Sequence, residues 1–385
     1  MTSDREFDNV LSSYLADEGR RIEADAPPIE QAAREVASRV ADGELRTLDR
    51  RGVLLLVAAL LVAGLVGSML ALGRGLLPTP TVNQVDGTVV FATTNQIRTR
   101  DLDAAQSQIS LTGVGHVLYL APSPNGNRLA FLVQHTTQGE TTLWISESDG
   151  LPAQVGEAGP HRWHLDWDPN GGRIAFLAGD GRLAIVEAVP PFVRRDIELP
   201  PDLSADEAVW HPDGNEIFLR DGATMAVHAV DVQTGSNRLV LPPSEELRAP
   251  GADTLWISDD GGRLALFLQQ EVHVVDLGSG KVTIWEPGGI MAAGALSSDG
   301  ELLGAVLDDR LVIATPLGRL VHEIAIDVDG PIGVQSLAFA PDSRRLLVVP
   351  DGQARAWLVD ATTGRLDEID WGLDGGQMIR WLPGD

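Results

Sequence analysis

The 385-residue chain contains no cysteine. Its absence excludes disulfide bonds, a thiolate nucleophile and every zinc site that uses cysteine ligands. Lysine is almost absent as well: Lys281 stands against 28 arginines, which we interpret as a compositional bias of the source. The sequence also lacks a Gly-x-Ser-x-Gly motif, so the exposed serine of a nucleophile elbow is not predicted.

Positive charge is scarce relative to negative charge, and the formal net charge is -26. Residues 1–51 carry 12 acidic and 8 basic side chains and residues 52–77 only Arg74, which leaves about -23 for residues 78–385. Such a surface repels phosphate backbones, so nucleic acid is not a predicted ligand. The acidic surface serves either solubility or a specific docking face, and the sequence leaves both open.

One long hydrophobic run interrupts this polar sequence. Residues 53–72 contain no charge, and 20 residues are enough to cross a bilayer as a helix. A cleaved signal peptide is the alternative, but about 50 residues precede the run and no small-x-small site follows it. Basic residues favour a cytoplasmic N-terminus, because only Arg74 follows the run closely whereas five arginines lie within about 20 residues before it: Arg34, Arg39, Arg46, Arg50 and Arg51. We therefore predict localisation in the cytoplasmic membrane with the C-terminal part outside.

The segment before the predicted span has the pattern of two short amphipathic helices. Ser3 and Glu6 have capping-box spacing at the start of the first, and Pro27 and Pro28 separate it from the second. Two such helices make little core of their own. Residues 4–41 are therefore either a docking element for a protein partner or a spacer. The predicted boundaries are 1–51 for a cytoplasmic helical segment, 52–73 for the transmembrane helix, 74–86 for a linker and 87–385 for the main domain.

A short phrase recurs six times in that main domain. It consists of a bulky residue, a turn built on Asp/Asn-Gly and an apolar β-type run, as in Trp167 to Phe176 and Trp210 to Leu219. The turn glycines stand at 126, 171, 214, 261 and 300, and Ser343 takes the sixth place. A period in the low forties made of strands and tight turns predicts an all-β propeller with one four-stranded blade per period.

The two ends of the repeat region predict how the ring closes. Three strands, at 88–93, 96–102 and 108–111, precede the first phrase, while one inner strand, at 378–382, follows the last period. Together they complete one blade. We therefore predict a seven-bladed β-propeller closed by the C-terminal strand, with residues 378–382 paired against residues 88–93.

The W-x-P-D/N-G-x-R-I/L-A-F phrases of residues 87–385 resemble the WD-repeat-like propellers of the TolB type. The copies at 296–305 and 339–348 depart from the pattern by losing the tryptophan. This resemblance implies the fold and is nearly silent on function. Residues 1–51 followed by one span also resemble bacterial membrane proteins with anti-sigma-like cytoplasmic heads, and the lack of cysteine excludes the zinc type of such heads.

Candidate sites are few. Asp166, Asp168, Asn170 and Gly171 spell the opening of a calcium loop, but Leu177 stands where the loop needs a bidentate Glu, so a blade turn is preferred. Asp327 to Gly330 is a shorter match. His161, His164 and Asp166 would hold a metal only if they met at the channel mouth, and His211 has a structural position. We therefore predict no catalytic, cofactor or metal residues, and we expect the tryptophans to pack between blades.

The resulting functional hypothesis is a membrane-anchored binding or scaffolding module outside the cytoplasm. It has a protein partner on the propeller face, and it relays an outside contact to residues 4–41. The alternative is a propeller enzyme, a hydrolase or lyase, with its active site in the central channel. Carboxylates and histidines with perturbed pKa values at one channel mouth would favour the enzyme.

Overall fold

The computed structural model describes residues 87–93, 95–102, 108–134, 141–147, 151–159, 164–244, 254–307, 310–326, 337–349, 355–370 and 377–382. The chain divides into two units, Met1–Asn83 and Gln84–Asp385, and the described residues all belong to the second. The predicted helices, span and linker of residues 1–86 lie outside the described residues. Within the described ranges, no helix is sufficiently long and apolar to cross a bilayer.

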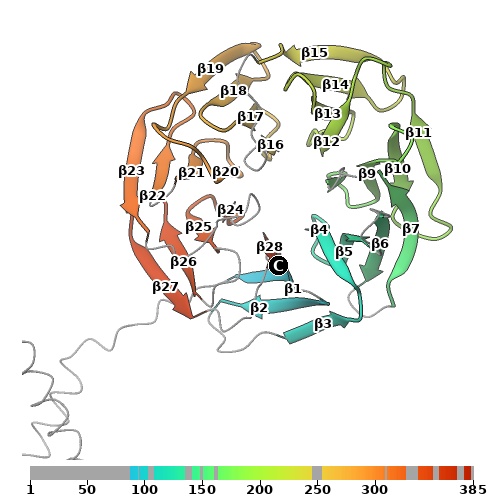
Figure 1. Cartoon of the computed structure of the whole chain (residues 1–385), viewed down its shortest axis with the longest axis horizontal. Helices are drawn as coiled ribbons and strands as arrows, with labels where there is room; N and C mark the ends of the chain where they lie inside the picture. Colours follow the sequence, from blue (N-terminus) through green and yellow to red (C-terminus); the bar gives the residue numbers. More distant parts are fainter. Residues whose placement is uncertain are drawn as a thin grey trace, which may run out of the picture. The chain divides into compact units, whose positions relative to one another are not determined.

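The described residues form seven four-stranded antiparallel sheets arranged around a ring (Figure 1). We number the first six blades along the chain. Blade 1 contains β4 (His116–Pro122), β5 (Arg128–Gln134), β6 (Thr141–Glu147) and β7 (Ala153–Ala158). Blade 2 contains β8 (Leu165–Trp167), β9 (Arg173–Leu177), β10 (Leu183–Glu187) and β11 (Arg194–Ile197). Blade 3 contains β12 (Ala205–Trp210), β13 (Glu216–Asp221), β14 (Val227–Asp231) and β15 (Asn237–Leu241).

The remaining blades follow the same order from the inner strand outward. Blade 4 contains β16 (Thr254–Ile257), β17 (Arg263–Phe267), β18 (Val272–Asp276) and β19 (Lys281–Trp285). Blade 5 contains β20 (Ala293–Leu296), β21 (Leu303–Leu307), β22 (Arg310–Ala314) and β23 (Leu320–Ala325). Blade 6 contains β24 (Leu337–Phe339), β25 (Arg345–Val348), β26 (Arg355–Asp360) and β27 (Leu366–Asp370). The closing blade contains β28 (Gln377–Trp381), β1 (Thr88–Thr93), β2 (Gln96–Asp101) and β3 (Gln108–Thr112).

The closing blade joins the two ends of the propeller, as predicted. The C-terminal strand β28 pairs antiparallel with β1, with Trp381 opposite Val89 and Arg380 opposite Val90. The Leu382 amide adds a bond to the Thr88 carbonyl at 2.8 Å. The number of blades and the closure are therefore confirmed. The strand itself begins and ends one residue before the predicted 378–382.

The repeated turn has the backbone that its glycine predicts. All five turn glycines have φ between 66° and 75°, the left-handed region that costs glycine nothing. Ser343 adopts the same conformation, with φ of 59°. The Asp168 carboxylate fixes the turn of blade 2 by accepting the Gly172 amide at 2.7 Å and the Arg173 amide at 2.9 Å. This side chain therefore serves the turn.

Arginines after these turns link neighbouring blades. The Arg128 side chain of blade 1 donates to the Gly171 carbonyl of blade 2 at 3.3 Å. Arg173 of blade 2 pairs with Asp168 at 3.0 Å, and its guanidinium lies over the Trp210 ring of blade 3 at 4.8 Å from the centroid. The repeated phrase thus supplies contacts between neighbouring blades as well as the turns.

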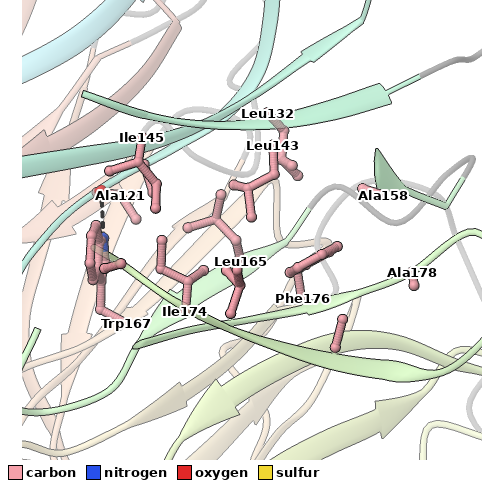
Figure 2. Packing of buried hydrophobic residues seen from close by; sticks show 14 of the residues in the cluster. Ala121, Leu132, Leu143, Ile145, Ala158, Leu165, Trp167, Ile174, Phe176 and Ala178 are labelled. Carbon is pink, nitrogen blue, oxygen red and sulfur yellow. Dashed lines mark hydrogen bonds between the residues drawn. The ribbon is translucent and has the colours of Figure 1, made fainter. Parts of the chain in front are cut away.

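The hydrophobic core lies between blades. The described residues form seven buried clusters, and each cluster joins two neighbouring blades. Figure 2 shows the cluster between blades 1 and 2, where Leu143 faces Leu165 and Phe176, and where the Trp167 indole donates to the Ala121 carbonyl at 2.9 Å. Truncating one such leucine, phenylalanine or tryptophan to alanine costs about 2–5 kcal/mol. As predicted, tryptophans lie buried in these clusters: Trp167, Trp210, Trp285, Trp357 and Trp381.

Candidate functional site in the central channel

The inner strands present alternate residues to the centre of the ring, because side chains of a strand alternate between its faces. The residue six positions before the turn glycine is buried between blades, as Leu120 and Leu165 are. The residues seven and five positions before it line the centre. In blades 1 to 4 the earlier of these two positions holds Tyr119, His164, Glu207 and Thr254.

A cavity of about 570 Å³ occupies this side of the channel. Its volume falls in the range of roughly 300–1,000 Å³ that small-molecule sites have. Its polar wall comes from blades 1 to 4 and from the closing strand, with the side chains of Tyr119, His164, Asp166, Glu207, Thr254 and Arg380. The turns that follow the inner strands also border it, through Ser123, Pro169, Pro212, Asp259, Ser298 and Pro341.

A β-bulge in β12 turns two successive acidic side chains toward one arginine. The register of β12 shifts between Ala205 and Glu207. Arg220 of the neighbouring β13 places its Nε 2.9 Å from Asp206 Oδ1 and its Nη1 3.3 Å from Glu207 Oε2. The Leu255 amide of blade 4 donates to the same Glu207 oxygen at 3.1 Å. Bulges often redirect side chains beside functional sites, and this one aims Glu207 at the cavity.

The other oxygen of Glu207 contacts the histidine of blade 2. His164 Nδ1 lies 3.3 Å from Glu207 Oε1. The His164 ring in turn lies 4.9 Å from the Tyr119 ring, measured between centroids, and the Arg380 guanidinium lies over that tyrosine at 5.1 Å. A continuous row of contacts therefore runs from blade 3 through blades 2 and 1 to the closing strand.

Asp166 of blade 2 lines the same cavity. Its Oδ2 accepts the Trp210 amide of blade 3 at 2.7 Å. The Trp210 indole lies in the core between blades 2 and 3, and its Nε1 is buried without a hydrogen-bond partner in the described part of the chain, unlike the Trp167 and Trp381 indoles, which donate to the Ala121 and Ala338 carbonyls.

Burial raises the pKa values of the acidic groups in the cavity and lowers the pKa of the histidine. Burial raises the pKa of Asp166 from 3.8 to about 7, against the hydrogen bond from the Trp210 amide, which lowers it. Burial also raises the pKa of Glu207 to about 7, against the Arg220 charge. The pKa of His164 falls to about 3, first because of burial and then because of Arg220. Burial raises the pKa of Tyr119 as well.

These values set the chemistry that the cavity can perform near neutral pH. Each of the two carboxyls exists in both protonation states there, so each can accept or donate a proton. His164 is neutral and can accept or donate one hydrogen bond at each ring nitrogen. Arg380 is the one arginine among the described residues that line the cavity. The site can therefore bind polar groups, and it has the components of general acid–base chemistry.

The structure places the candidate residues named from the sequence in different surroundings. His164 and Asp166 both reach the cavity, whereas His161 and Asp327 to Gly330 lie outside the described residues. Asp168 holds the blade turn, as preferred from the sequence. His211 contacts Asp213 at 2.9 Å and the Gly261 carbonyl of blade 4 at 3.3 Å, a structural role at the rim of the cavity.

No group of three or more His, Asp or Glu side chains is placed to hold a metal ion among the residues that the structure describes.

Sequence reasoning missed Tyr119, Glu207 and Arg380. A signal for the first two was present: counting seven residues back from each turn glycine reads Tyr119, His164, Glu207, Thr254 and Ala293 in successive blades. A position that is polar in four blades and apolar in the next departs from what a repeat needs for folding alone. The signal for Arg380 is weaker: it stands directly before Trp381, as Asp166 stands before Trp167.

Comparison with known proteins supports the fold. No protein-family profile matches the chain, and no curated protein sequence matches it. Among solved structures, TolB from Acinetobacter baumannii is similar with 17% identity and a TM-score of 0.46, over 63% of this chain and 65% of that one. The periplasmic gluconolactonase of Pseudomonas aeruginosa is similar with 18% identity and a TM-score of 0.54, over 77% of this chain and 99% of that one. At this identity the second likeness shows the propeller fold.

Proposed function

We propose that the propeller is a binding module that holds a small polar ligand in its central-channel cavity. The observation that carries the proposal is the presence of polar side chains at one channel position of four successive blades. Seven residues before the turn glycine, blades 1 to 4 have Tyr119, His164, Glu207 and Thr254, whereas blade 5 has Ala293 at the same position. Since alanine serves the fold at this position in blade 5, the polar side chains of the other four blades serve something else.

The cost of keeping these groups supports the same conclusion. A carboxyl whose pKa rises on folding destabilises the folded state whenever it is ionised. Asp166 and Glu207 both have such pKa values, and both face a cavity of ligand size. Ionisable groups with this combination of burial and perturbed pKa gather at functional sites.

Direct binding to the full chain tests the proposal. Calorimetry against a panel of sugars, amines, amino acids and nucleosides should find at least one ligand with saturable binding. Glu207→Gln should weaken that binding at least tenfold, because it removes an ionisable group of the wall. The matched control Asp202→Asn, an exposed residue before β12, should bind as the parent does. A ligand that binds Glu207→Gln and the parent equally would place the site elsewhere and contradict the proposal.

A second candidate function, an enzyme of the hydrolase or lyase class, is favoured by one observation. Two carboxyls with pKa values of about 7 lie in one cavity with a neutral histidine, and such groups can act as general acids and bases at neutral pH. Since one similar structure is a gluconolactonase, sugar lactones belong in the substrate panel. Proton release at constant pH measures their hydrolysis. Turnover that Asp166→Asn and Glu207→Gln both abolish would identify an enzyme, and equal rates with and without protein would reject it.

We further propose the membrane topology that the sequence predicts, with residues 53–72 as the span and the propeller outside the cytoplasm. The support is the uncharged run and the arginines before it. The cysteine-free chain allows a direct test with single cysteines. In intact cells a membrane-impermeant maleimide should label Asp202→Cys and should leave Ser12→Cys unlabelled until the membrane is opened. Labelling of both, or of Ser12→Cys alone, would refute this topology.

The relay to the N-terminal segment remains part of the proposal. Residues 4–41 have the pattern of amphipathic helices that need a partner to bury their apolar faces. The full chain should therefore co-purify with a cytoplasmic protein, with a sigma factor as the first candidate to probe. A variant that lacks residues 4–41 should lose that protein. Retention of the same protein by the shortened variant would contradict the relay.

A further inference from the structure

We propose that the ligand of the central cavity is an organic cation, which the carboxylates of Asp166 and Glu207 bind, and that its binding releases protons from these groups. This inference rests on the proposed function and names the ligand class of the same site. It is carried by the charges of the cavity wall, by the contacts that already occupy the arginines, and by the aromatic groups beside the carboxylates.

The charges that line the cavity are mainly negative. Among the described residues that line the cavity, three are acidic, Asp166, Glu207 and Asp259, and one, Arg380, is an arginine. His164 contributes no charge near neutral pH, because its pKa is about 3. With the acids ionised the wall therefore has more negative than positive charge. A cation would restore the balance, whereas an anion would add to the imbalance.

The two nearby arginines are already engaged by the protein. Arg220 lies behind the wall, where it pairs with Asp206 at 2.9 Å and with Glu207 at 3.3 Å. Arg380 covers the Tyr119 ring and donates from Nη1 to the Ile379 carbonyl at 3.0 Å. Neither guanidinium is thus presented as the open two-pronged donor that recognition of a carboxylate or phosphate uses.

The aromatic side chains of the wall suit an organic ammonium better than a bare metal ion. Tyr119 and the partly buried Trp256 line the cavity on either side of the blades that carry the two acids. Aromatic rings beside carboxylates attract alkylated ammonium groups, because the ring faces and the carboxylates are both negative. The described residues offer no cluster of three metal ligands.

Proton release follows from the surroundings of the two acids. The charged groups that act on them are Asp206 of β12, Arg220 of β13 and Arg380 of β28, and Glu207 also acts on Asp166. The groups beside them are His164, which lies 3.3 Å from Glu207, and Tyr119, whose pKa both acids raise. Burial outweighs the arginines and keeps both acids partly protonated near pH 7. An entering cation favours the ionised forms, so it displaces protons from them.

Three probes of nearly equal shape test the charge. Choline carries a permanent positive charge, 3,3-dimethyl-1-butanol is its neutral counterpart, and 3,3-dimethylbutyrate is negative. Titration calorimetry with the full chain should show binding of choline and none, or much weaker binding, of the other two. Because each carboxyl must ionise, choline affinity should rise about tenfold per carboxyl between pH 6 and pH 8. Heats measured in two buffers of different ionisation enthalpy should show protons released.

Substitutions in the cavity test whether choline binding and proton release occur there. Asp166→Asn and Glu207→Gln should each weaken choline binding and reduce the number of protons released, while Asp202→Asn should change neither. Choline that binds no better than its neutral counterpart, or binding of 3,3-dimethylbutyrate alone, would overturn the cation inference. A neutral sugar from the wider panel that binds the cavity in that case would leave the proposed function standing. Absence of binding by the whole panel would reject both.

Discussion

The replacement Asp166→Asn should stabilise the propeller in alkaline solution and leave its stability in acid unchanged. Asp166 is a partly buried acid whose pKa rises from 3.8 to about 7 on folding, chiefly because of burial. Asparagine keeps a side-chain oxygen that can accept the Trp210 amide, which Asp166 now does at 2.7 Å. The substitution thus removes the buried charge with little change of shape.

The sign of the effect follows from proton binding. Because the pKa of Asp166 is higher in the folded chain, the folded state binds more protons than the unfolded state between about pH 4 and pH 7. The free energy of unfolding therefore falls as the pH rises through that window, and the whole penalty is present above about pH 7. Since one pKa unit corresponds to about 1.4 kcal/mol, the upper limit of the penalty is about 4 kcal/mol. Partial exposure of Asp166 reduces the expected gain for Asp166→Asn to roughly 2–3 kcal/mol at pH 8.

Thermal unfolding of the full chain, followed by circular dichroism from pH 4 to pH 8, measures this gain. A gain of this size raises Tm by several degrees at pH 8. Parent and variant should unfold at the same temperature near pH 4. The exposed Asp202→Asn makes the same change of charge and should follow the parent at every pH. A variant that is less stable than the parent at pH 8, or equally stabilised at all pH values, would refute the burial argument.

Three further substitutions test how the ring is held together, each by guanidinium unfolding. Arg173→Met removes the ion-pair partner of the buried Asp168 and the guanidinium over the Trp210 ring, so it should lower the free energy of unfolding by about 1–3 kcal/mol. The control Arg182→Met, at a more exposed ion pair, should lower it by less than about 1 kcal/mol. Equal losses would contradict the contact between blades. Trp381→Ala empties a buried site in the closing strand and should cost about 3–5 kcal/mol, and a negligible loss would show that closure is dispensable. Gly294→Ala directs a methyl group of blade 5 into the Phe267 ring of blade 4 and should cost about 1–3 kcal/mol, so unchanged stability would mean that the phenylalanine ring moves aside freely.

The fold was readable from the sequence because a repeat reports the same local chemistry many times. Glycine tolerates positive φ better than other residues do, and the structure has positive φ at every marked glycine. Three unpartnered strands at the start and one at the end predicted the closing blade, which pairs Trp381 with Val89. These features depend on residues close in sequence and on the count of strands, so no knowledge of distant contacts was needed.

The site was only partly readable. His164 and Asp166 were noted from the sequence, but as metal candidates, and the structure instead places them in a row with residues from other blades. Glu207 looked like one acid among many, since its role depends on the β-bulge that turns it and Asp206 toward Arg220. Arg380 looked like part of a terminal strand, and ring closure brings it over Tyr119.

The sequence by itself determined the architecture of this protein: the turns, the strand alternation and the number of sheets are local properties written in each period. The tertiary structure decided which side chains share the cavity and what their pKa values are. The physical reason is that burial and charge act through space, and residues from Tyr119 to Arg380 become neighbours only when the ring is closed.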